Sequence, residues 1–237
     1  GNFQNLFLQW GDADVAIFKK GTDLIHPILE PIIDDQLILP DHLKKIEEKI
    51  QKWFKETYLS KLDLSDQLKK FNSKPEERSF IFKIIEGQYN FYQTNILDEF
   101  KLIDEPQRKE IHSLNFRLGK NVIFNSELIR PEYMKLKFHL WNLYYNENLK
   151  IDEYIPKDGN ATLKIQNNLK KELITFLGFI LRNDLLIRLD IFNEFEKQLF
   201  KRENRGPFSL PMDLSNLLGI KKDKLINILE SRSFIIQ

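Results

Sequence analysis

The chain has 237 residues, of which 42% are hydrophobic and 30% are charged, a composition that excludes an intrinsically disordered chain. It contains no apolar run near the roughly 20 residues of a membrane-spanning helix, so we expect no membrane partner. The absence of cysteine excludes disulfides, thiol catalysis and thiolate metal sites, and it fits a reducing compartment; we expect a cytoplasmic protein. With 36 basic and 35 acidic residues the net charge is +1, which excludes a strongly basic nucleic-acid binder.

The N-terminal segment predicts a β-hairpin followed by helices. Apolar residues alternate on both sides of Gly11-Asp12, a turn signal, which is typical of two paired strands. A helix is predicted from Asp41, whose carboxylate can accept the free amides of the first turn. Its apolar stripe has helical spacing and comprises Leu43, Ile46, Ile50, Trp53 and Phe54. Further helices are expected from Ser73, with Pro75 in the first turn, and after Pro106.

The middle of the chain predicts a second hairpin and a central helix. Residues 116–124 alternate on both sides of Gly119, which indicates strand, tight turn and strand. Pro131 then begins a helix that reaches about Tyr145, and apolar residues nearly encircle it. We therefore expect this helix to be covered on most of its surface.

The C-terminal third predicts another hairpin between helices. One helix should stop at Gly178, and Asn183-Asp184 within a β-rich run favours a hairpin. A helix from Asp190 carries Phe192, Phe195 and Leu199 on one face. The expected fold class is α+β, predominantly helical, with short β-hairpins and a helix-turn-helix-like pair at the C-terminus. We expect two domains, residues 1–148 and 163–237, joined by a linker at 149–162 that is rich in Asn, Asp, Pro and Gly.

Residues 210–230 have the pattern of a helix-turn-helix. With Gly219 as the left-handed turn residue, apolar residues fall where two short crossed helices touch, and Ser215 supplies the small residue. Lys221, Lys222 and Lys224 stand at the start of the second helix, where phosphates are contacted in such motifs. A helical pair used only for packing has the same pattern, and the helix start lacks the Arg, Asn or Gln residues that read bases.

No catalytic motif occurs in the chain. The phosphate-binding loop G-x-x-x-x-G-K-[ST] is absent, as are G-x-S-x-G, H-E-x-x-H and G-x-G-x-x-G. The four histidines lie far apart without metal-ligand spacing, and we expect them to be surface or packed residues. We therefore predict no catalytic residue, no metal site and no cofactor in this chain.

Several segments together resemble a family of bacterial helicases. The run from Phe116 through Phe124, followed by 126–132 and 136–141, resembles the region beyond the motor in superfamily 2 DExH-type helicases related to the mitochondrial RNA-degradosome helicase. Similar pieces follow the same order at 25–35, in the Trp53 helix, at 178–195 and at 209–234. The resemblance implies a C-terminal accessory part of such a helicase, with the ATP- and Mg-dependent motor lobes N-terminal to Gly1. The first residue, Gly rather than Met, fits a piece of a longer protein.

These observations lead to three functional hypotheses. In the first, the chain is a helicase accessory region that binds single-stranded RNA or DNA or docks partners, since cations interleaved with aromatic residues suit a single strand. The cations expected to bind nucleic acid are Arg117, Lys120, Arg130, Lys135 and Lys137, with Lys221, Lys222 and Lys224 from the helical pair. The preferred contact is the hairpin tip with Lys120 and Arg117. The second hypothesis is a helix-turn-helix DNA-binding regulator, and the third is a purely structural interaction domain.

Overall fold

The computed structural model describes residues 2–4, 6–10, 12–32, 40–71, 74–157, 160–165, 169–232 and 234. Contacts divide the chain into two compact units. Unit 1 comprises Gly1–Gln67 with Lys135–Leu149, and unit 2 comprises Leu68–Met134 with Lys150–Gln237. Among the described residues, no helix combines the length and the apolar character needed to cross a bilayer. The predicted α+β, predominantly helical fold with short β-hairpins is confirmed.

Unit 1 begins with a four-stranded antiparallel sheet in the order β1-β2-β3-β4. The strands are β1 (Asn2–Gln4), β2 (Phe7–Trp10), β3 (Ala13–Lys19) and β4 (Ile28–Pro31). Strands β2 and β3 pair from Phe7 opposite Ile17 to Trp10 opposite Ala13, which confirms the first hairpin. The inward side chains of this sheet include Leu8, Ala16 and Phe18, all at most 3% exposed.

The helices after the sheet are α1 (Pro40–Phe54), the π-helix η1 (Lys55–Leu59), α2 (Ser60–Leu62) and α3 (Ser65–Leu68). Helix α1 begins one residue before the predicted Asp41, which lies in the first turn, where a carboxylate stabilises the positive helix end. Of its apolar stripe only Phe54 is buried, with its ring 5.5 Å from that of Phe18. The remainder of the stripe is partly exposed.

Helix α7 (Pro131–Tyr145) has the predicted bounds and is covered on most sides. In unit 1 its buried apolar residues include Leu136, Phe138 and Trp141. The Trp141 indole Nε1 donates a hydrogen bond to Glu147 at 3.2 Å, and its ring lies 4.4 Å from that of Tyr145. The expectation of a largely covered helix is confirmed, because a helix that is apolar on nearly all faces has to be packed on nearly all faces.

Unit 2 contains two three-stranded antiparallel sheets, ordered β5-β7-β6 and β8-β10-β9. The first has β5 (Asn90–Tyr92), β6 (Phe116–Leu118) and β7 (Val122–Asn125), and the second has β8 (Thr162–Lys164), β9 (Phe179–Arg182) and β10 (Leu185–Arg188). The pairs β6–β7 and β9–β10 are the second and third predicted hairpins, and both are confirmed.

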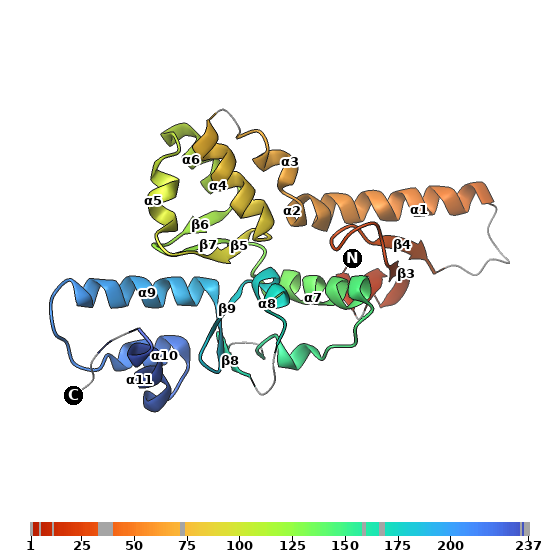
Figure 1. Ribbon diagram of the computed structural model, residues 1–237. Coiled ribbons are helices and arrows are strands. Elements are labelled where there is room, and N and C mark those ends of the chain that lie inside the picture. The colour runs from red at the N-terminus through yellow and green to blue at the C-terminus, as the bar shows by residue number, and fades with distance from the viewer. Residues whose placement is uncertain are drawn as a thin grey trace. The chain divides into compact units, whose positions relative to one another are not determined.

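The helices of unit 2 are α4 (Pro75–Glu86), α5 (Ile96–Lys101), α6 (Glu105–Ser113), α8 (Lys171–Leu177), α9 (Leu189–Glu203), α10 (Met212–Leu218) and α11 (Lys222–Glu230). Helices α4 to α6 lie on one side of the sheet β5-β7-β6, and α9 lies on the other (Figure 1). The predicted start of α4 at Ser73 falls outside the described residues. Helix α8 ends as predicted at Gly178, which has a left-handed φ of +88°.

The unit boundaries differ from the predicted division at 149–162. Residues 68–134 cluster with the C-terminal third, because Val122 and Phe124 of β7 join Phe192 and Phe195 of α9 in one buried core. The segment predicted as a linker also contributes packed residues. It contains the short 3-10 helix η2 (Ile151–Glu153), and Tyr154 after it is 2% exposed.

Candidate nucleic-acid interface

The β6–β7 hairpin carries the two preferred cations at its surface. Arg117 is exposed, and its Nη1 donates to the carbonyl oxygens of Phe116 at 3.0 Å and His112 at 3.3 Å. Its guanidinium is thus held against the end of α6. Lys120 is exposed at the hairpin tip, and its Nζ lies 4.4 Å above the ring centre of Phe200 in α9. Of the two, Lys120 is the cation that meets an aromatic ring.

The other cations predicted between 115 and 150 are placed differently. Arg130 is exposed in unit 2, directly before α7, and Lys135 is exposed in unit 1. Lys137 is only 1% exposed, so its ammonium group cannot reach a phosphate, and its assignment as a nucleic-acid contact is wrong. Burial lowers the pKa of Lys137 to about 7. The periodicity of α7 explains the error, because a helix covered on nearly all sides also buries its polar positions.

Four aromatic residues of that segment are not available for stacking. Those that the sequence places among the cations, Phe116, Phe124, Tyr133 and Trp141, are at most 6% exposed. They belong to the packed interior, as aromatic residues at core spacing usually do. A stacking surface therefore has to come from other residues.

The helix-turn-helix-like pair is confirmed as two short helices. Helix α10 ends at Gly219, whose φ of +64° lies in the left-handed region that favours glycine. The Ser215 hydroxyl donates to the carbonyl oxygen of Ile220 and ties the turn together. Lys221 and Lys222 are exposed at the start of α11. Lys224 is partly exposed and pairs with Asp184 in the β9–β10 turn, with 2.6 Å between Nζ and Oδ2.

Helix α9 carries a row of side chains of which the sequence analysis names only Phe192; along the row, Phe192 is 0%, Glu196 6% and Phe200 42% exposed. Phe192, Glu196 and Phe200 follow each other at four-residue spacing, which places them on one face over two turns, about 12 Å. Five side chains from other segments pack on this row: Tyr92, Lys120, Asn121, Arg182 and Arg232. We call these eight residues the α9 ridge.

Residues at and beside the tip of the β6–β7 hairpin contact successive turns of α9. Tyr92 pairs with Val122 across β5 and β7, and its ring lies 6.0 Å from that of Phe192. Next along the tip, the Asn121 side chain reaches Glu196, and Lys120 then reaches Phe200.

Gly119 permits the close approach of the tip to the helix. A Cβ at this position would stand 1.7 Å from Oδ1 of Asn193, so a larger residue here would require the Asn193 side chain to move.

Arg182 covers one end of the ridge. Its guanidinium carbon lies 4.5 Å above the Tyr92 ring and 4.9 Å above the Phe192 ring, distances typical of cation–π contacts. Burial lowers the pKa of Arg182, while its contacts with Tyr92 and Glu196 act in the opposite direction. An arginine stays protonated in either case at neutral pH, so the ridge carries a fixed positive charge here.

Glu196 is the one acid of the ridge, and it is 6% exposed. Its Oε1 accepts a hydrogen bond from Nη1 of Arg232 at 2.6 Å, and its Oε2 accepts one from Nδ2 of Asn121 at 3.2 Å. The ion pair between Glu196 and Arg232 holds the chain just beyond the end of α11. The ion pair between Lys224 and Asp184 holds the first turn of α11. Helix α11 is thereby held at both ends.

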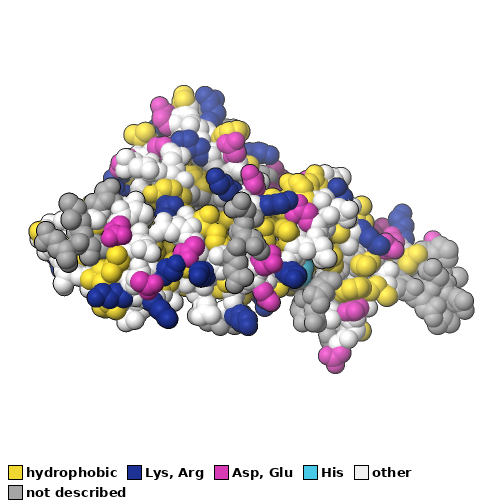
Figure 2. Space-filling view, turned by 60° about the horizontal axis from the view of Figure 1, so that its bottom comes forward, with side chains coloured by type: hydrophobic (Ala, Val, Ile, Leu, Met, Phe, Trp, Pro, Cys, Tyr) yellow, Lys and Arg dark blue, Asp and Glu magenta, His cyan; other side chains and the backbone are white. Residues whose placement is uncertain are grey.

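The ridge combines charge with exposed rings. It has three cations against one buried carboxylate, and it presents Tyr92 at 38% and Phe200 at 42% exposure. Figure 2 shows basic, acidic and hydrophobic side chains interspersed over one face of the molecule, in line with the net charge of +1. A local group of cations beside open rings, rather than a broad basic field, is therefore what the surface offers a nucleic acid.

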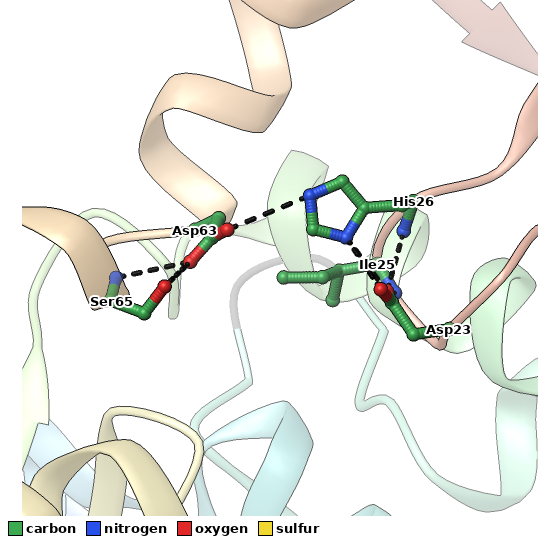
Figure 3. Close-up of polar contacts among 5 residues, drawn as sticks. All are labelled: Asp23, Ile25, His26, Asp63 and Ser65. Atoms are coloured by element: carbon green, nitrogen blue, oxygen red, sulfur yellow. Dashed lines mark hydrogen bonds and ion pairs between the residues drawn. The ribbon is translucent and has the colours of Figure 1, made fainter.

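A second polar cluster lies in unit 1 around His26 (Figure 3). The imidazole Nδ1 is 2.8 Å from Oδ1 of Asp23, and Nε2 is 3.5 Å from Oδ2 of Asp63. The Ser65 hydroxyl donates to Asp63 at 2.5 Å and not to the histidine, so there is no serine–histidine relay. Burial raises the pKa of Asp23, but hydrogen bonds from His26 and Ile25 outweigh it, and the pKa is lowered. The cluster ties the loop before β4 to the start of α3.

Within the described part of the chain, no group of three or more histidine, aspartate or glutamate side chains is arranged to hold a metal ion. In comparisons with known proteins, no family model matches this chain, and neither does any curated protein or solved structure.

Proposed function

We propose that this chain is an accessory, non-motor part of an ATP-dependent helicase and that it binds single-stranded RNA or DNA. The α9 ridge is the observation that supports this most, because a nonspecific single-strand site needs cations along the backbone and open aromatic faces for the bases. Lys120, Arg182 and Arg232 supply the first, and Tyr92 and Phe200 supply the second. The resemblance to the region beyond a DExH-type motor also supports it, because a helicase motor produces single strands.

The role of the chain in this proposal is to hold a strand and not to do chemistry on it. The sequence has no phosphate-binding loop, and in this proposal ATP and Mg are bound by motor lobes outside this sequence. A fixed, partly exposed row of cations and rings on a packed helix gives a strand a defined path. Coding sequence upstream of residue 1 that encodes a phosphate-binding loop supports the proposal, and an unrelated upstream domain contradicts it.

Salt-dependent binding to a fluorescein-labelled oligouridine tests the proposal. Binding that neutralises the three ridge cations gives a slope of log affinity against log salt of about −2, since each single-strand phosphate contact contributes about −0.7. A blunt duplex of the same length is the control, and we expect it to bind more weakly. A chain that binds neither probe at low salt contradicts the proposal and favours a purely structural interaction domain.

The helix-turn-helix-like pair favours a second candidate, a DNA-binding regulator. Lys221 and Lys222 are exposed at the start of α11, where such motifs contact phosphates. This candidate predicts sequence preference in duplex DNA and loss of binding on charge reversal at Lys221 and Lys222. Oligouridine binding that survives both reversals favours the helicase accessory function.

A further inference from the structure

Two aromatic residues of the α9 ridge, Tyr92 and Phe200, each contact a cation at the surface. The proposed function does not by itself require this arrangement. The Arg182 guanidinium lies over the Tyr92 ring, and the Lys120 ammonium lies over the Phe200 ring. Both residues nevertheless are more than a third exposed. Each therefore combines a contact with a cation and surface that solvent reaches. Neither ring belongs to the buried core of unit 2.

The distance between the two rings determines what they can hold. Tyr92 packs on Phe192, which lies two helical turns, about 12 Å, before Phe200. Stacked neighbouring bases are about 3.4 Å apart, so adjacent stacked bases cannot occupy both rings. An extended single strand can, and its intervening backbone can meet Arg232, whose side chain is 29% exposed.

We propose that the α9 ridge is a two-point stacking site for single-stranded nucleic acid, in which Tyr92 and Phe200 each take one base and Lys120, Arg182 and Arg232 face the backbone between them. This inference rests on the proposed function and adds the site and its binding mode. Duplexes are excluded from it because paired bases do not offer their faces to a side chain.

Oligouridine affinities of the full chain test the site, with Tyr92→Ala, Phe200→Ala and the double variant. Each single variant is expected to weaken binding about 5- to 150-fold, the effect of losing one stacked base. The two losses should multiply, because Tyr92 contacts Phe192 and Arg182 whereas Phe200 contacts Lys120, so these contacts have no shared partner. Tyr92→Phe keeps the ring and should bind as the wild type does.

Phe82→Ala is the matched control, because Phe82 on α4 is 65% exposed in the same unit and lies outside the ridge. It should leave the affinity unchanged. If the wild type binds and the ridge variants bind equally well, or if Phe82→Ala weakens binding as much, the stacking site is refuted while the proposed function stands. A wild type that binds no oligouridine refutes the proposed function itself.

Tryptophan fluorescence of a variant that keeps a ring at residue 200 tests the site even if the alanine variants fail to fold. Phe200→Trp retains a large ring, and a base that stacks on it should quench its emission as oligouridine is added. Phe82→Trp should show no ligand-dependent change beyond that of the wild type, whose three tryptophans all lie in unit 1. Equal quenching in the two variants overturns the proposal.

Discussion

Replacing Glu196 with glutamine should lower stability and raise nucleic-acid affinity together. Glutamine has nearly the same shape and helix propensity, so the change removes a charge and little else. The buried carboxylate accepts hydrogen bonds from both Arg232 and Asn121. A neutral amide retains one acceptor oxygen and turns an NH₂ group toward the other donor.

The expected loss of stability follows from these two contacts. A hydrogen bond to a charged group contributes about 1.5–3 kcal/mol. The Arg232 side chain is 29% exposed and regains water when its partner is neutralised, so the full cost of an unpaired buried charge does not apply. We expect a decrease of about 2 kcal/mol in the free energy of unfolding, or about 4–8 °C in Tm for a chain of this length.

The expected gain in affinity has an electrostatic origin. A negative charge about 8 Å from a phosphate costs roughly 0.5 kcal/mol in water, so its removal should strengthen binding about twofold at low salt. The gain should vanish near 1 M salt, where the Debye length falls to about 3 Å. Scanning calorimetry measures the decrease in Tm. Fluorescence anisotropy with labelled oligouridine, at a temperature where both proteins are folded, measures the affinity.

Glu194→Gln is the matched control. It removes the same charge from α9, but Glu194 is 41% exposed and pairs with Lys197 at the surface. It should change Tm little. If Glu196→Gln lowers affinity while the protein is folded, or if the two variants have equal stability, the account of Glu196 as the buried acid of a nucleic-acid surface is refuted.

Three further predictions concern other parts of the chain. Lys120→Glu together with Arg117→Glu should weaken oligouridine binding without unfolding the protein, with Lys120→Glu carrying most of the loss because only Lys120 lies on the ridge; unchanged affinity at low salt removes the hairpin tip from the interface. Trp141→Ala should cost about 3–5 kcal/mol of stability, measured by urea unfolding, because Trp141 is 6% exposed, and an unchanged midpoint contradicts its role in packing. The pKa of Lys137 is about 7 in the folded chain and about 10.4 in the unfolded chain. Between these pH values the unfolded chain binds more protons, so the free energy of unfolding of the wild type should rise with pH by at most about 5 kcal/mol. Lys137→Met should lack this rise, and equal pH profiles of the two proteins would refute the burial of an uncharged Lys137.

Local signals were enough to predict much of the fold. Gly119 and Asn183-Asp184 mark turns between alternating strands, and both hairpins form there. Gly219 separates two short apolar helices at a left-handed turn. In each case the signal is a conformational requirement of a few neighbouring residues, which a sequence displays directly.

The α9 ridge could not be predicted in the same way. Its contacts join Tyr92 to Arg182 and Lys120 to Phe200, residues far apart in the chain that only the packing of β7 on α9 brings together. The four-residue spacing of Phe192, Glu196 and Phe200 is a local signal, but the sequence does not show which residues pack on them. Conversely, Lys137 lies among cations in the sequence, and only the packing of α7 shows that it is buried.

Photo-crosslinking of the full chain to an oligonucleotide that contains 4-thiouridine, with the attached peptides identified by mass spectrometry, locates the bound strand on the protein. We expect crosslinks in the peptides that contain Tyr92 and Phe200, reduced by high salt and absent in the double alanine variant. Crosslinks confined to the start of α11 at Lys221 and Lys222, or to unit 1, would contradict binding at the α9 ridge.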